Sequence, residues 1–290
     1  MPRPVCITYD STCDLTPHLL ERFHIRTVPL TIQSGERVFP DDGQYTSADL
    51  YADYRSNGTL PKTAAVSPEE FRAFFAPILD EGYDIVHIDI SSELSCTCQN
   101  AVMAAQELAE RGQVHVVDSR QLSTGGGLLA LQGAKLRDSG LAAADIAAEL
   151  RRLAPHSDTS FVLDTLEYMW KGGRCSGVTA LGANMLKLKP SLEIRDGKLV
   201  VCKKYRGAME KVYRQYVTER LADKAVVEDW AFITHSGEVA EDTLRELTAL
   251  VQELAPFKEV FVTQAGCTVS SHCGPGTLGV LFLRRVEADA

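Results

Sequence analysis

Short β-rich runs alternate with segments of helical periodicity through the first half of this sequence. Residues 5–9, 84–90 and 114–117 are mostly apolar and have the length of strands, and apolar residues at helical spacing follow each run. Strands that alternate with helices in this way are typical of a largely parallel sheet with helices on both faces. The sequence therefore predicts an α/β fold.

The clearest local signal marks the start of a helix after Ser67. A serine at the N-cap, Pro68 in the first turn and Glu70 at the third helical position form a capping box. Thr16 and Pro17 give a weaker form of the same signal for an earlier helix. Residues 25–32 have the composition of one continuous strand.

Two domains are expected because 290 residues exceed the usual size of a single core. Residues 34–62 are rich in turn residues, with one short helix after Ser47, and should form a small inserted layer. The helical pattern stops near residue 155, and an Asp-Gly hairpin signal follows at 196–197. We predict an N-terminal α/β domain over 1–155 and a C-terminal mixed α/β domain over 156–290.

The charge balance makes nucleic acid and anionic membranes poor partners. Lys and Arg number 30 against 39 Asp and Glu, and the formal net charge of -9 repels phosphate-rich surfaces. The N-terminal residues lack the apolar core and cleavage site of a secretion signal. We expect a cytoplasmic protein without stable membrane insertion.

Several familiar catalytic and cofactor motifs are missing from the sequence. The serine within residues 173–177 stands one place too late for a Gly-x-Ser-x-Gly elbow. The glycines at 125–127 precede Leu-Leu-Ala instead of Gly-Lys-Ser, so close helix packing or a tight helix entry explains them better than a phosphate-binding role does. Cys96 and Cys98 lack the spacing of a zinc site. We expect no metal and no cofactor.

Polar residues collect where the predicted strands end, at 10–12, 91–92, 118–119, 164–165 and 235–236. Because parallel α/β sheets bind ligands at that edge, these clusters predict one crevice, although such residues also cap helices. Residues 260–283 carry no charged side chain and should form two buried strands joined by a loop. His272 lies in that loop, where it could bind an anion or be a neutral structural residue.

Seven blocks of sequence resemble, in order, the DegV family of bacterial fatty-acid-binding proteins. They are residues 10–14 (Asp-Ser-Thr-Cys-Asp), 62–68 (Lys-Thr through Ser-Pro), 91–97 (Ser-Ser-Glu-Leu-Ser-Cys-Thr), 171–177 (Lys-Gly-Gly-Arg-Cys-Ser-Gly), 189–190 (Lys-Pro), 204–207 (Lys-Tyr-Arg-Gly) and 272–276 (His-Cys-Gly-Pro-Gly). The resemblance covers nearly the whole chain. It implies a two-domain DegV-like fold with the ligand held between the domains.

The resemblance also implies a function. Such proteins bind one long-chain fatty acid and present its carboxylate to a separate fatty acid kinase, which forms an acyl phosphate. On this basis the chain would be a carrier with no catalytic residue of its own. Thr63 and Ser95 match the positions that bind the carboxylate, and His272 matches a histidine close to it.

The same blocks supply the remaining expected contacts. They place Ser92, Arg174 and Gly274 among the ligand-binding residues. Arg174 matches an arginine of the head-group face, and Arg206 matches an arginine associated with docking of the kinase. The resemblance thus implies one site and one docking residue.

The chain departs from the family pattern beside the expected carboxylate site. Alanines stand at 64 and 65 in place of Ser-Gln, and cysteines stand at 96 and 98 in place of glycine and tyrosine. These departures bear on which acyl chain is preferred. Two other functions stay open: hydrolysis of an acyl ester by Ser95 and His272, or binding of a small ketone through His272, by resemblance to the more distant dihydroxyacetone kinases.

Overall fold

The computed structural model describes residues 3–175, 188–222 and 224–285. Its first sheet is parallel throughout, with the strand order β2-β1-β6-β7. The strands are β1 (Val5–Asp10), β2 (Ile25–Val28), β6 (Asp84–Asp89) and β7 (Val114–Asp118). The parallel α/β arrangement predicted from the alternating pattern is confirmed.

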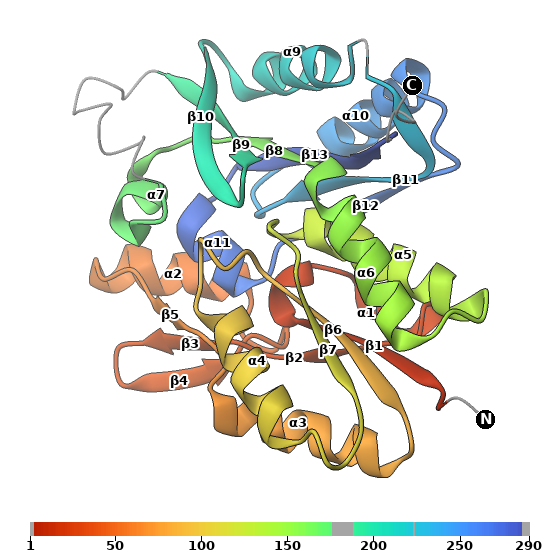
Figure 1. Cartoon of the computed structure of the whole chain (residues 1–290). Coiled ribbons are helices and arrows are strands. Elements are labelled where there is room, and N and C mark those ends of the chain that lie inside the picture. The colour runs from red at the N-terminus through yellow and green to blue at the C-terminus, as the bar shows by residue number, and fades with distance from the viewer. Residues whose placement is uncertain (1–2, 176–187, 223, 286–290) are drawn as a thin grey trace.

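Helices cover both faces of this sheet (Figure 1). One face carries α3 (Pro68–Asp80) and α4 (Thr97–Glu107), and the other carries α5 (Thr124–Asp138) and α6 (Ala143–Leu153). The capping box predicted for α3 is present, because Ser67 Oγ accepts from the Glu70 N–H while the Glu70 carboxylate accepts from the Ser67 N–H. Thr16 likewise caps α1 (Pro17–Arg22).

The second sheet is mixed, with the order β10-β9-β8-β13-β11-β12. Its strands are β8 (Ser157–Val162), β9 (Lys189–Arg195), β10 (Lys198–Tyr205), β11 (Val226–His235), β12 (Glu259–Gln264) and β13 (Leu278–Arg284). Only the β11–β12 pair is parallel among these described strands, and β9 and β10 form the hairpin predicted at residues 196–197. Helices α9 (Met209–Leu221) and α10 (Glu241–Leu254) cover the outer face (Figure 1).

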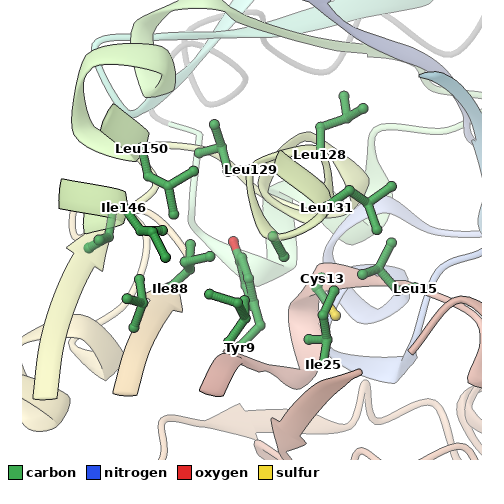
Figure 2. Packing of buried hydrophobic residues seen from close by; sticks show 14 of the residues in the cluster. Tyr9, Cys13, Leu15, Ile25, Ile88, Leu128, Leu129, Leu131, Ile146 and Leu150 are labelled. Carbon is green, nitrogen blue, oxygen red and sulfur yellow. The ribbon is translucent and has the colours of Figure 1, made fainter. Parts of the chain in front are cut away.

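Helix α5 lies between the two sheets and contacts β1, β8 and β13. Its leucines pack over Tyr9 and Ile88 of the first sheet, as Figure 2 shows, and the same core cluster includes Phe232 and Leu281 of the second. A methyl group at Gly126 would overlap the Tyr9 hydroxyl. The predicted close helix packing of the triple glycine is therefore confirmed, and the domain boundary near residue 155 stays a prediction.

A small antiparallel sheet, β4-β3-β5, corresponds to the predicted inserted layer. It consists of β3 (Thr31–Ser34), β4 (Arg37–Pro40) and β5 (Lys62–Ala64), and α2 (Ser47–Asn57) follows β4 in the chain. The prediction of one strand over 25–32 is wrong, because the chain leaves the first sheet after Val28. Pro29 has no N–H to donate to a ladder, and the Leu30 N–H bonds to Ser11 Oγ instead of to a strand.

Shorter helices complete the described fold. They are η1 (Ser11–Cys13), η2 (Ala154–His156), α7 (Glu167–Gly172) and α11 (Cys267–Cys273). The loop predicted between the strands of 260–283 contains α11, so that His272 lies in the last turn of a helix. In the described parts of the chain, no helix combines the length and apolar character that a membrane crossing requires.

Candidate functional site

A cavity of about 370 Å³ lies where α11, β5, α7 and the turn before α4 come together. Most of its lining is apolar, and these side chains are Leu30, Ala64, Ala65, Ile90, Leu94, Leu122, Met169, Leu199 and Val269. Polar lining groups come from Thr63, Ser95, Arg174, Thr268 and His272. Four of the predicted site residues therefore meet at one cavity, although they come from four separate segments of the chain.

His272 is the one histidine in the lining of this cavity among the described residues. Its Nε2 lies 3.3 Å from Thr63 Oγ1, and its Nδ1 is buried with no hydrogen-bond partner among the described residues. Burial, with a smaller contribution from the charge of Arg174, lowers the pKa of His272 from 6.5 to about 4. The ring is consequently neutral at physiological pH.

Gly172 explains why the ring of His272 stays in place. A methyl group at Gly172 would overlap His272 Nδ1, so the backbone of α7 lies directly against the imidazole. Arg174 folds back over the same turn and donates to the Gly172 carbonyl over 2.7 Å. The Gly-Gly-Arg part of block 171–177 thus supports the histidine, while residues 176 and 177 of that block lie outside the described residues.

Ser95 is oriented by the start of α4. Its Oγ lies 2.7 Å from Thr97 Oγ1 and accepts from the Thr97 N–H over 3.3 Å. Ser95 therefore bonds to Thr97, and His272 bonds to Thr63. Within the described residues no hydrogen bond joins Ser95 to His272, although a serine nucleophile requires such a bond to its base.

Carboxylates from distant segments hold the other end of α11. Asp14 accepts from the Gly266 N–H, and Asp41 accepts from the N–H groups of Cys267 and Thr268. Burial raises the pKa of Asp14 to about 8. Block 10–14 therefore positions the helix that carries His272. Sequence analysis missed Asp41, since nothing in its local sequence separates it from an ordinary turn residue.

Three predicted residues lie outside the cavity lining. Ser92 is exposed and donates to Asp118, and Arg206 is exposed after the end of β10. Gly274 follows α11 with a φ of 76°, and its carbonyl accepts from Ser236. The structure thus brings Thr63, Ser95, Arg174 and His272 together without these three.

Thr268 is a cavity residue that the sequence did not reveal. Its Oγ1 is buried and has no hydrogen-bond partner within the described chain. Thr268 precedes His272 by one helical turn, so both side chains share a face of α11. Because the sequence did not predict this helix, the four-residue spacing of Thr268 and His272 could not be interpreted as one helix face. The described residues contain no group of three or more His, Cys, Asp or Glu side chains that could hold a metal ion.

Comparison with known sequences gives one consistent match. The family model of the DegV proteins matches residues 4–285. A DegV domain-containing protein of Clostridium acetobutylicum is 30% identical over 280 residues, which are 96% of this chain and 98% of that protein. A DegV domain-containing protein of Deinococcus radiodurans is also 30% identical, over 95% of this chain and 97% of the other.

Solved structures share the fold. A DegV family protein from Thermus thermophilus, described by its fatty acid binding, has 31% identity and a TM-score of 0.86 over 98% of this chain and 100% of its own. A DegV lipid binding protein from Thermotoga maritima has 25% identity and a TM-score of 0.84 over the same shares. The fatty acid kinase B3 protein of Streptococcus pneumoniae, loaded with linoleic acid, has a TM-score of 0.83 at 21% identity, which shows the fold alone.

Proposed function

This chain belongs to the DegV family, and from that premise we propose that its cavity binds a long-chain fatty acid with the carboxylate at Thr63 and Ser95. The observation that carries the proposal is the composition of the lining, in which apolar side chains surround a small polar group of hydroxyls and one neutral histidine. Fatty acid binding by the Thermus relative and lipid binding by the Thermotoga relative support it.

The apolar lining suits an acyl tail. Each methylene that leaves water for an apolar wall stabilises the complex by about 0.8 kcal/mol. The cavity volume of about 370 Å³ falls within the range of about 300–1,000 Å³ that small-molecule sites occupy. Tail burial would therefore supply most of the affinity, and the polar end would fix the direction in which the acid enters.

The polar end suits a carboxylate. A buried anion without donors costs several kcal/mol, and the hydroxyls of Thr63 and Ser95 can each donate one hydrogen bond. Neutral His272 adds a possible N–H donor without a permanent charge. Arg174 lines the cavity yet is itself exposed, so its guanidinium would mark the mouth through which the head group meets solvent.

We also propose that the chain is a carrier that presents the carboxylate to a fatty acid kinase. This chain shares the fold of a fatty acid kinase B3 protein, and the separate hydrogen bonding of Ser95 and His272 argues against an ester hydrolase. Exposed Arg206 would orient the partner by charge, an effect that raises the rate of encounter without entering the cavity.

Native mass spectrometry of the freshly purified protein tests the binding proposal first. We expect a retained fatty acid, and after its removal we expect oleate to raise the melting temperature, since a ligand that binds only the folded state stabilises it. Protein that carries no lipid and shows no thermal shift with oleate or palmitate would exclude a fatty acid carrier.

Titration calorimetry of variants then locates the head group. Thr63→Val and Ser95→Ala should each weaken oleate binding by about 1–3 kcal/mol, because a charged acceptor loses a donor. Ser56→Ala removes a hydroxyl from the exposed face of α2 and is the matched control. Wild-type affinity in both cavity variants would place the carboxylate elsewhere.

A coupled assay with a purified fatty acid kinase tests presentation. Arg206→Ala should lower the rate of acyl phosphate formation and leave oleate affinity unchanged, whereas Arg245→Ala, an exposed arginine of α10, should change neither. Loss of oleate affinity in Arg206→Ala would relocate this residue to the cavity. If the isolated chain hydrolyses esters and Ser95→Ala abolishes this activity, the protein is an ester hydrolase and the carrier proposal is wrong.

A further inference from the structure

We propose that a second, polar cavity, located beside the β9–β10 hairpin, binds a small oxyanion that also carries hydroxyl groups. The cavity measures about 460 Å³ and lies between the N-terminal half of β8, the C-terminal end of β9 and the C-terminal end of α9. It shares no lining residue with the apolar cavity beside α11. The proposal therefore does not depend on fatty acid binding.

Buried polar atoms without partners point to a ligand at this cavity. Among the described residues, Gln121 Oε1 and Arg220 Nε have no hydrogen-bond partner, although both residues line the cavity. Thr159 Oγ1 is unpaired as well, but it lies against Gly125 of α5. A buried polar atom that bonds to nothing destabilises the fold. Two such atoms at one cavity indicate groups that a bound molecule satisfies.

The side chains that carry these atoms are held in place. Gln121 Nε2 donates to the Ala154 carbonyl over 3.0 Å, which fixes the amide group while its oxygen stays without a partner among the described residues. Arg220 Nη1 donates to Glu193 Oε2 over 2.7 Å, and its Nη2 pairs with Asp158. Binding at the remaining atoms would consequently need little ordering of side chains, which is the usual cost of recognition.

The charge of the lining selects an anion. Five basic and three acidic side chains line the cavity, a local positive excess in a chain whose net charge is -9. The basic residues are Arg120, Arg195, Arg220, Lys224 and Arg284. Arginine presents several N–H donors in a fixed planar fork that fits phosphate and carboxylate oxygens.

The unpaired atoms add a second requirement. Arg220 Nε donates and Gln121 Oε1 accepts. A simple anion would leave Gln121 without a donor, and a neutral polyol would leave the positive excess uncompensated. One molecule that carries both an oxyanion and hydroxyl groups satisfies both atoms, and the volume is within the range of small-molecule sites.

Titration calorimetry of the full-length chain with glycerol 3-phosphate tests the proposal, with inorganic phosphate and glycerol as partial ligands. We expect one glycerol 3-phosphate per chain, bound at least about tenfold more tightly than inorganic phosphate, and no binding of glycerol. Absence of glycerol 3-phosphate binding at millimolar concentration, or equal affinity for phosphate and glycerol 3-phosphate, would overturn the assignment and leave water as the occupant.

Variants place the binding at this cavity. Lys224→Ala at the rim and Gln121→Leu in the wall should each weaken glycerol 3-phosphate binding at least about fivefold. Lys211→Ala, an exposed lysine of α9 outside the lining, is the control. Undiminished binding in Lys224→Ala would overturn the assignment even if Gln121→Leu does not fold, and circular dichroism together with urea unfolding reports whether each variant is folded.

Discussion

The two ends of α11 differ in how completely their polar groups are paired. At the N-terminal end, Asp14 and Asp41 accept from three successive backbone N–H groups. At the other end, His272 lines the cavity with its ring, and its Nδ1, which lies against Gly172, has no partner among the described residues. The paired end fixes the helix, and the other end carries the ring that lines the cavity.

The difference also shows which electrostatic effect dominates in this short helix. A helix C-terminus favours a protonated histidine by about 0.3–2 kcal/mol. The pKa of His272 is nevertheless lowered from 6.5 to about 4 by burial and the Arg174 charge. Since one pKa unit corresponds to about 1.4 kcal/mol, desolvation outweighs the helix dipole at this end.

The largest expected effect comes from a substitution that removes hydrogen bonds at the N-terminal end of α11. Asp41→Ala removes the acceptor of two buried N–H groups, at about 1–3 kcal/mol each, so we expect the free energy of unfolding by urea to fall by about 2–6 kcal/mol. Asp42→Ala, at the exposed neighbouring position, is the control and should change stability little. Equal effects of the two substitutions would mean that α11 is held by other contacts.

The next substitution acts on the cavity end. Gly172→Ala places a methyl group where the His272 ring lies, and such overpacking costs about 1–3 kcal/mol. Oleate affinity should fall with it. A double-mutant cycle measured by urea unfolding checks the cause, because the same substitution in a His272→Ala background has no ring to displace. An unchanged cost in that background would contradict the proposed contact.

The two ends should respond to pH with opposite signs. Because the pKa of His272 is lower in the folded chain, the unfolded chain binds its proton first as pH falls. The associated stability is present above pH 6.5 and is lost as pH falls towards about 4. In urea unfolding of the ligand-free protein, the free energy of unfolding should fall less steeply with falling pH in His272→Gln than in the native chain. Parallel pH curves for the two proteins would contradict this prediction.

The smallest effect concerns Asp14, whose pKa is raised from 3.8 to about 8. Its stabilising contribution is complete below pH 3.8 and is lost as pH rises through about 8. Asp14→Asn retains the acceptor for Gly266 and a donor towards Ser123, so stability below pH 3.8, where the native carboxyl is also neutral, should change by less than about 1 kcal/mol. Urea unfolding of Asp14→Asn should lose the decline in stability between pH 3.8 and about 8, and a decline that persists in this variant would assign it to another group.

The local sequence was sufficient to predict those elements whose stabilising hydrogen bonds and turn residues all lie within one short segment. The capping box at Ser67 and Glu70 predicts the start of α3, since both hydrogen bonds lie within four residues of each other. The Asp-Gly pair at 196–197 likewise predicts the β9–β10 hairpin, because that turn needs residues that tolerate a positive φ. The resemblance to the DegV family added the cavity residues Thr63, Ser95 and His272, which spacing alone could not join.

Tertiary structure decided the features that depend on distant partners. Seven residues of α11, rich in Ser, Thr and Cys, carry little helix propensity, and their N-terminal N–H groups bond to carboxylates more than 200 positions away in the chain. No short stretch of sequence around His272 includes these hydrogen-bond acceptors. Sequence by itself therefore determined the alternating α/β order and the local helix starts, while the folded chain decided that His272 lies on a helix, because only folding supplies the acceptors that complete it.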